Sequence, residues 1–174
     1  MKTSLTKKFT HIYLGKYWYN LKKDDLHWNL SDNGWAKMAW SGVFGPWSQA
    51  AGVFIHEMNK FESPKIIETL IKHPITSICA APTLYRSLVV AKDINKLHPS
   101  GEKQNSLQLR QCLSAGEPLN EEVIKKWNDI TNIVIREGTL VYSYNKNDEH
   151  IPIRDFMFKP LILLQLEGCM SNLI

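Results

Sequence analysis

The sequence predicts an α/β fold in which a largely parallel sheet is flanked by helices. Short apolar runs of strand type recur along the chain at 75–80, 109–113 and 133–135. Segments with helical periodicity and capping residues precede the first of these runs, at 63–72, and separate the last two, at 121–129. Strands that alternate with helices of about ten residues form βαβ units, and such units build parallel sheets.

The composition is that of a globular protein. The 174 residues are 44% hydrophobic and 22% charged, which allows one domain with a sizeable core. The formal charge is +4, and six lysines precede the first acidic residue, Asp24. A basic, acid-free start is typical of a transit peptide or of an arm that contacts phosphates. The aromatic run at 11–19 favours a solvated edge instead, and we expect no nucleic-acid partner.

The cysteines and histidines show no metal-ligand spacing. Cys79, Cys112 and Cys169 stand far apart, and no two histidines are placed at i and i+4. We therefore expect no metal site. Cys79 and Cys112 fall inside predicted strands and are expected to be buried, reduced thiols, as in an intracellular protein. No apolar run approaches the length of a membrane span.

The same alternation is expected in the N-terminal part of the chain. A strand at 24–28 leads through the polar turn 29–34 into a helix that begins near Trp35 and is ended by Gly45-Pro46. A further strand is expected at 53–55. The residues between, 47–52, fit either a second helical turn or a loop.

Capping residues define the central helices. Ser63 is expected to cap the helix 63–72, with Pro64 as its first residue, and His73-Pro74 ends it. Another helix is expected to start at 81–83. The polar segment 92–106 is expected to be a surface loop.

The segment 107–120 is expected to form a strand, a turn and the start of a helix. Leu107 and Leu109 alternate with Arg110 and Cys112, the period of two that a strand requires, and Gln111 would continue the leucine face. A turn at 114–116 follows, in which Gly116 allows a positive φ or the close approach of a flat ligand.

The helix after this turn is well specified at its start. Asn120 is a suitable N-cap, Glu121 and Glu122 suit the positive end of the helix, and Leu119 and Ile124 form a hydrophobic staple. In an open α/β sheet, a loop between a strand end and a helix is where ligands bind. An ordinary connection between a strand and a helix would have the same composition.

Five stretches of the chain carry a shared pattern. They are Asp32-Asn-Gly-Trp-Ala-Lys-Met-Ala-Trp40, Phe44-Gly-Pro-Trp47, Ala81-Pro-Thr-Leu-Tyr-Arg86, Ser114-Ala-Gly-Glu-Pro118, and Trp127 followed by Ile135-Arg-Glu-Gly138. In order and with few gaps, they resemble the central segment of the medium-chain acyl-CoA synthetases, which belong to the adenylate-forming (AMP-binding) superfamily. A lone piece would be a weak match, whereas five in register are specific.

The resemblance implies a ligase that works in two steps. A carboxylate attacks the α-phosphate of Mg-ATP to give an acyl-adenylate, and the thiol of coenzyme A then displaces AMP. The implied cofactors are ATP, Mg²⁺ and coenzyme A, and the implied substrate is a medium-chain fatty or aromatic carboxylic acid. The family also implies the mitochondrial matrix, although the N-terminus is not a clear transit peptide.

The resemblance assigns one group of residues to the nucleotide. Gly116, Glu117 and Pro118 match the family segment that lies along adenine, and Glu137 and Gly138 match the start of its Glu-Gly-Tyr-Gly-Gln-Thr-Glu motif. For Glu117 we expect the backbone to contact adenine, while its carboxylate interacts with the dipole of the next helix.

A second group matches positions near the acyl pocket: Trp35, Ala81, Pro82 and Thr83. Each has a plainer interpretation. Trp35 would by default be a core residue of an amphipathic helix. Ala81 and Pro82 would by default start a helix, and they can do so while also lining a pocket.

The chain departs from the family after Glu137-Gly138. The family motif continues Tyr-Gly-Gln-Thr-Glu, whereas this chain reads Thr139-Leu-Val-Tyr-Ser-Tyr144. The threonine that contacts phosphate and the glutamate that binds magnesium are therefore missing from the motif. We also find no phosphate loop with its lysine upstream, and no ribose-binding aspartate or C-terminal catalytic lysine downstream. We expect the chain alone to be inactive and to bind no cofactor productively.

These matches divide the chain in two. Residues 1–138 are expected to be a partial AMP-binding domain, and residues 139–174 a divergent tail with no recognised domain. The tail holds the apolar, uncharged run 161–166, which predicts self-association between chains. The alternative to an enzyme is a non-enzymatic remnant that binds an acyl chain or a partner subunit.

Overall fold

Five strands and seven helical segments make up the described part of the protein. The computed structural model describes residues 12, 14–32, 34, 37–58, 60–98 and 107–138. The strands are β1 (Leu26–Leu30), β2 (Gly52–Phe54), β3 (Ser77–Ala80), β4 (Gln111–Ala115) and β5 (Ile135–Gly138). The α-helices are α2 (Gly45–Ser48), α3 (Ser63–Lys72), α4 (Pro82–Val89) and α5 (Glu121–Thr131). Two π-helical segments, η1 (Leu14–Trp18) and η2 (Met38–Phe44), and a 3-10 helix, η3 (Ile94–Leu97), complete them.

All described strands belong to one parallel sheet. Its order is β2-β1-β3-β4-β5, and each pair of neighbours is parallel. The predicted α/β class and the parallel sheet are therefore confirmed. Helices between consecutive strands return the chain to the same end of the sheet, as parallel pairing requires.

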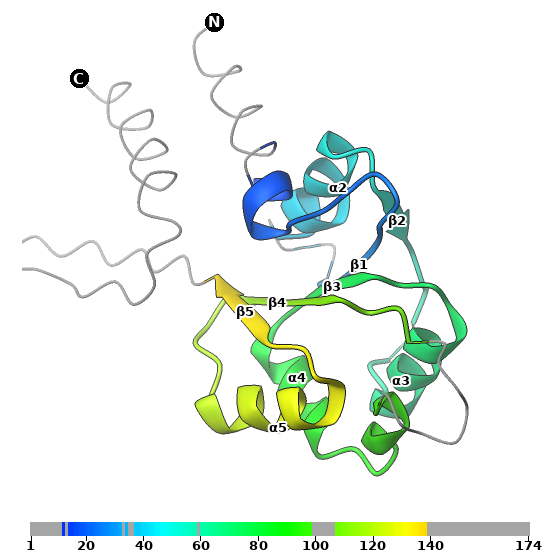
Figure 1. Cartoon of the computed structure of the whole chain (residues 1–174), viewed down its shortest axis with the longest axis vertical. Coiled ribbons are helices and arrows are strands. Elements are labelled where there is room, and N and C mark those ends of the chain that lie inside the picture. The colour runs from blue at the N-terminus through cyan, green and yellow to red at the C-terminus, as the bar shows by residue number, and fades with distance from the viewer. Residues whose placement is uncertain are drawn as a thin grey trace, which may run out of the picture.

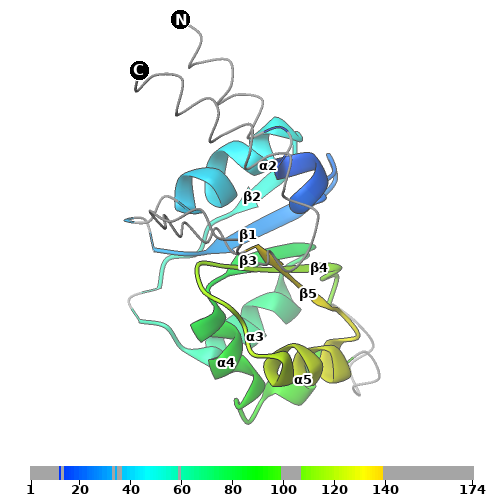
Figure 2. The ribbon, with the colours of Figure 1, turned by 90° about the vertical axis from the view of Figure 1, so that its left-hand side faces the viewer.

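The sheet is the middle of three layers. Helices α3, α4 and α5 lie on one face, while η1, η2 and α2 lie on the other (Figures 1 and 2). The larger core is on the α3–α5 side, where Ile66, Ile67 and Leu70 form the buried stripe of α3. Trp127 of α5 is fully buried there, edge-on to Tyr85 of α4.

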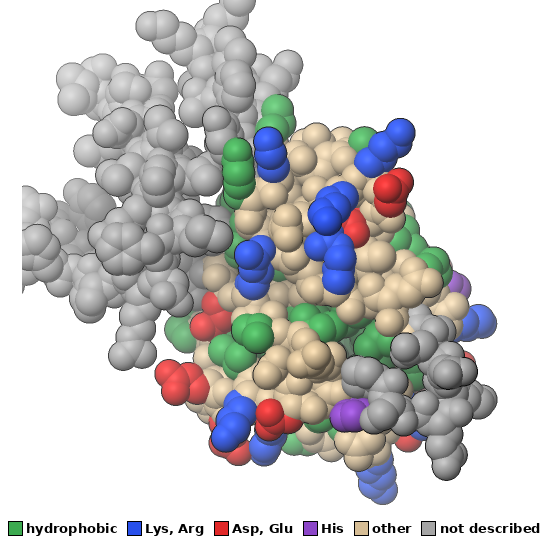
Figure 3. Space-filling model, in the orientation of Figure 1, with side chains coloured by type: hydrophobic (Ala, Val, Ile, Leu, Met, Phe, Trp, Pro, Cys, Tyr) green, Lys and Arg blue, Asp and Glu red, His purple; other side chains and the backbone are tan. Residues whose placement is uncertain are grey.

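A smaller core lies on the other face, formed by Tyr19, Leu21, Ala51, Cys79 and Leu113. Because both faces are covered, β3 is buried along its whole length, as expected for a parallel strand between two helical layers. On the face of the molecule seen in Figure 3, exposed apolar side chains lie at about the level of the sheet, with charged ones above and below.

Strand β4, which was predicted at 109–113, begins two residues later than predicted. Pairing with β3 starts at Gln111, opposite Ser77, and β4 runs to Ala115. Leu109 lies before the strand and packs in the same core as Cys112, so it does not share a face with Gln111. The prediction that Leu109 and Gln111 lie on one face was wrong. Side chains alternate between the two faces of the sheet only from Gln111 on, where pairing with β3 begins.

Two helix boundaries differ from the predicted ones. Gly45-Pro46 does not end the helical segment: η2 continues directly into α2, where Pro46 occupies the first turn and its missing N–H costs no hydrogen bond. The predicted helix 63–72 is confirmed, but its N-cap is Glu62, because Ser63 is already helical. The predicted helix start at Trp35 lies outside the described residues.

The segment after α4 is more ordered than a surface loop. Residues 94–97 form η3, and its Ile94 and Leu97 are buried in the larger core. The prediction of a loop over 92–106 was therefore wrong at this point, because two apolar side chains within a polar stretch of sequence still reach the core. The rest of that range, 99–106, lies outside the described residues.

Candidate functional site

Three strand ends bring most of the predicted site residues together. Ala80 pairs with Ser114, Ser114 pairs with Glu137, and Ala115 pairs with Gly138. The segments 81–83 and 116–118 follow directly on β3 and β4. The acyl-side and nucleotide-side residues therefore meet at the carboxyl edge of the sheet, where open α/β sheets bind ligands. Trp35 lies outside the described residues.

The turn after β4 is open on one side. Gly116 has a φ of +119°, and a Cβ built there would meet nothing within 4 Å. The positive φ predicted for Gly116 is confirmed, and a flat ligand could approach its backbone without displacing a side chain. Glu117 and Pro118 are exposed beside it.

Arg86 of α4 holds this turn. Its Nη1 donates to Oε1 of Glu117 at 3.1 Å, and its Nη2 donates to the carbonyl of Pro118, also at 3.1 Å. The Glu117 carboxylate therefore pairs with Arg86, a contact that was not predicted, and the expected interaction with the dipole of α5 stays a prediction. Sequence reasoning missed this role of Arg86, although the residue ends one of the five matched stretches.

Glu137 of β5 holds the other end of the turn. The backbone N–H of Leu119 donates to Oε1 of Glu137. Asn120 is the N-cap of α5, as predicted, but its side chain makes no capping hydrogen bond. The segment 116–119 is thus fixed from two sides, by α4 and by β5.

Gly138 allows an aromatic ring to cover the end of β5. A Cβ built at Gly138 would lie 2.2 Å from Cζ2 of Trp18, closer than any real contact. Trp18 belongs to η1, on the opposite face from α5. The glycine at this position is therefore required for packing, in addition to any part in the nucleotide motif.

The segment 81–83 starts α4 as predicted. Ala81 is its N-cap, Pro82 is buried in its first turn, and Thr83 is exposed. Tyr85, two positions after Thr83, donates its hydroxyl hydrogen to the carbonyl of Leu113 at 3.0 Å. This bond ties α4 to β4 beneath the open turn.

Lys37 reaches the same edge from the other layer. Its Nζ donates to the carbonyl of Ala115 at 2.8 Å, across 78 positions of sequence. Burial lowers the pKa of Lys37, an effect that the neighbouring Cys79 opposes. Sequence reasoning did not identify this lysine, because nothing local predicts where its side chain ends.

A buried polar group lies deeper and is closed to ligands. Nδ1 and Nε2 of His27 lie 2.9 Å and 3.0 Å from the hydroxyls of Ser77 and Ser41. His27 is fully buried, which lowers its pKa to about 3, and the nearby Asp25 opposes that shift. Such a satisfied, neutral histidine links β1, β3 and η2, and we assign it a structural role.

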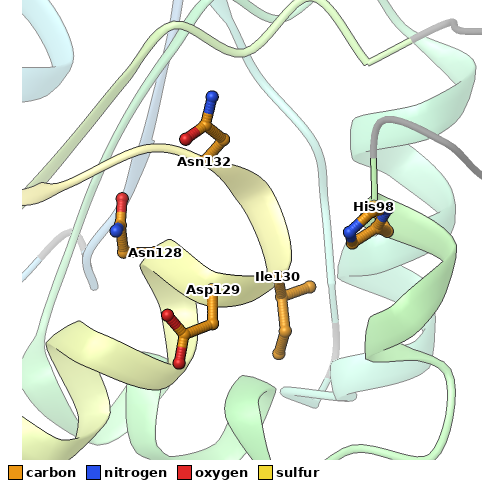
Figure 4. A pocket seen from close by; sticks show the side chains of 5 residues that line it. All are labelled: His98, Asn128, Asp129, Ile130 and Asn132. Carbon is orange, nitrogen blue, oxygen red and sulfur yellow. The ribbon is translucent and has the colours of Figure 1, made fainter.

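A surface hollow at the C-terminal end of α5 is not a convergent site. It is lined by His98, Asn128, Asp129, Ile130 and Asn132. Figure 4 shows that these side chains spread in different directions, with Asn132 and Asp129 pointing away from each other. The hollow also lies at the opposite end of α5 from the open turn, so it takes no part in the candidate site.

Within the described ranges, no group of three histidine, cysteine, aspartate or glutamate residues is arranged to hold a metal ion. Cys79 and Cys112 are free and buried, as predicted, and Cys169 lies beyond residue 138, where the description ends. None of the helices described is long and apolar enough to cross a membrane.

The parallel sheet and the exposed turn at its carboxyl edge, held by Arg86 and Glu137, define an open α/β fold. The chain belongs to the AMP-binding enzyme family, which matches residues 4–144. Over 124 residues it is 50% identical to the mitochondrial acyl-coenzyme A synthetase ACSM3 of Mus musculus, covering 71% of this chain and 20% of that protein. The chain thus spans about a fifth of the length of the curated relatives it matches.

Solved structures share the fold. An acyl-CoA synthetase of Brucella canis is 27% identical with a TM-score of 0.62, covering 83% of this chain and 27% of that one. The anthranilate CoA ligase AuaEII, in complex with anthranoyl-AMP, is 21% identical with a TM-score of 0.65, covering 77% and 25%. The predicted family and fold are confirmed by these matches.

Proposed function

We propose that this chain supplies the adenine-side loop and the acyl-side helix start of an acyl-CoA synthetase. The reaction would be the ATP-dependent ligation of a medium-chain fatty or aromatic carboxylic acid to coenzyme A through an acyl-adenylate. One observation carries the proposal: the ends of β3, β4 and β5 bring segments 81–83, 116–118 and 137–138 to one edge. The family match and the mitochondrial relatives support this reaction and a mitochondrial location.

The residues fit a nucleotide better than a metal ion. Gly116 leaves its backbone open, and Glu117 and Pro118 are held beside it by Arg86, so adenine would lie along this backbone. The acyl group would lie toward Ala81, Pro82 and Thr83; Trp35, the fourth residue predicted for the acyl pocket, lies outside the described residues. The Glu137 carboxylate accepts a hydrogen bond from Leu119, and within the described ranges no group of three acidic, histidine or cysteine residues is arranged to hold a metal ion.

We further propose that the 174-residue chain by itself does not turn over. Charge that develops at the α-phosphate needs aligned donors and a metal ion, which supply several kcal/mol in such sites. Where the family motif continues Tyr-Gly-Gln-Thr-Glu, this chain has Thr139-Leu-Val-Tyr-Ser-Tyr144. Coenzyme A and Mg²⁺ would then not be bound productively.

Pyrophosphate release tests this proposal. The purified chain is incubated with octanoate and Mg-ATP, beside a full-length acyl-CoA synthetase as positive control. We expect no release above background, together with AMP binding that is lost in Gly116→Trp, where a large side chain fills the open face of the turn. Release that scales with protein and disappears in Gly116→Trp would contradict the inactivity. AMP binding unaffected by Gly116→Trp would contradict the assignment of the turn.

The rival function is binding without chemistry. It is favoured by large exposed side chains on the η1–η2–α2 layer: Tyr17 is 53% exposed, Phe44 50% and Trp47 67%. A remnant of this kind would bind octanoate or a partner subunit equally well with and without AMP. The division of the chain at 138 and the self-association of 161–166 stay predictions, since those tail residues lie outside the described part.

A further inference from the structure

We propose that the ammonium of Lys37 binds an anionic oxygen of the ligand at the carboxyl edge of the sheet. The oxygen would belong to the carboxylate of the acid or to the phosphate of the nucleotide. The inference rests on the proposed function, which it extends by a residue that neither the matched motifs nor the relatives' names assign.

The position of the ammonium is the first argument. Nζ of Lys37 is 2.8 Å from the carbonyl of Ala115, the last residue of β4, and Gly116 follows immediately. Ala115 pairs with Gly138, and its neighbour Ser114 pairs with Ala80, after which the acyl-side segment begins. The charge therefore lies where the nucleotide-side and acyl-side segments meet.

Spare hydrogen-bonding capacity is the second argument. A lysine ammonium carries three donors. Among the described residues, Nζ of Lys37 makes one hydrogen bond, to the carbonyl of Ala115. Two donors therefore have no partner among the described residues.

The third argument is an uncompensated charge. Across the described ranges, no carboxylate lies within ion-pair distance of Lys37, whereas Arg86 pairs with Glu117 and Arg110 pairs with Asp25. Lys37 is only partly exposed, and its pKa is lowered by burial. A half-buried cation without a counter-ion is costly, and an anionic ligand would offset that cost.

A pair of matched ligands separates charge recognition from packing. Octanamide has the shape of octanoate without its charge, so their affinity ratio for the purified chain, measured by isothermal titration calorimetry, reports the ionic contact. We expect Lys37→Met to lower the affinity for octanoate about tenfold and to leave that for octanamide unchanged. Lys37→Arg should retain the preference for octanoate. Lys72→Met, at an exposed lysine of α3, is the matched control and should change neither.

A second pair of ligands, AMP and adenosine, tests whether Lys37 binds a phosphate oxygen. If the oxygen belongs to phosphate, Lys37→Met loses the preference for AMP over adenosine and keeps that for octanoate over octanamide. Unchanged preferences in both pairs, or an equal loss for charged and neutral ligands, would overturn the inference while the proposed function stands. A wild-type chain that binds neither octanoate nor AMP would overturn the proposed function and this inference together.

Discussion

The Glu137 carboxylate accepts a hydrogen bond from the backbone N–H of Leu119, 18 positions earlier in the chain. The contact joins the end of β5 to the turn between β4 and α5. Through this contact, Glu137 positions the backbone along which adenine is proposed to lie. Arg86 holds the same turn from α4, and the two contacts lead to separate predictions.

Removing the Glu137 carboxylate should loosen the turn without unfolding the sheet. A hydrogen bond to a charged acceptor contributes about 1.5–3 kcal/mol, so amide hydrogen exchange at Leu119 should accelerate about tenfold or more in Glu137→Ala. Glu137→Gln keeps an acceptor and should lie between wild type and alanine. The amide of Val123, bonded to Asn120 within α5, is the internal control. Equal exchange at Leu119 in all three proteins would contradict the contact.

The pair Arg86–Glu117 should contribute little to stability. The two side chains are 42% and 47% exposed, and exposed pairs are worth about 0.2–1 kcal/mol. A double-mutant cycle with Arg86→Ala and Glu117→Ala should therefore give a small coupling in urea unfolding. AMP affinity should fall in both variants, because the turn is less well positioned. The surface pair Lys126–Glu122 of α5 is the matched control, for which no effect on AMP is expected.

Gly138→Ala should destabilise the protein through Trp18. The added methyl would overlap the indole ring, and overpacking of this kind costs about 1–3 kcal/mol. Thermal unfolding measures the loss. The double variant Gly138→Ala with Trp18→Leu, which removes the ring, should recover part of it. Additive losses in the double variant would show that the two residues are not in contact.

Acidification should weaken the fold through His27. The folded pKa of about 3 is below the ordinary value of 6.5, so below pH 6.5 the unfolded chain binds a proton that the folded chain does not. The free energy of unfolding should therefore fall by about 1.4 kcal/mol per pH unit as the pH drops from 6.5 toward 3. Urea unfolding at pH values between about 4.5 and 6.5 measures the slope.

His27→Phe is the control for this slope. The variant is expected to be less stable, because Ser41 and Ser77 lose their partner, but its stability should depend less on pH by that same slope. An identical slope in wild type and variant would assign the pH dependence to other groups.

The sequence by itself determined the elements whose signals are local. The apolar stripe and Pro64 predict α3, the alternation of strands and helices predicts a parallel sheet, and Gly116 predicts the positive φ. The physical reason is that periodicity, capping and turn conformation depend on residues a few positions apart. The five matched stretches likewise identified the family.

Only the tertiary structure decided which distant residues meet. Register with β3, and not the apolar pattern, sets the start of β4 at Gln111, and packing against the core orders η3 within a polar segment. The same holds at the candidate site: Lys37 reaches Ala115, and Trp18 covers Gly138, over long separations in sequence. Such contacts depend on how layers pack and strands pair, and no local pattern in the chain encodes those distances.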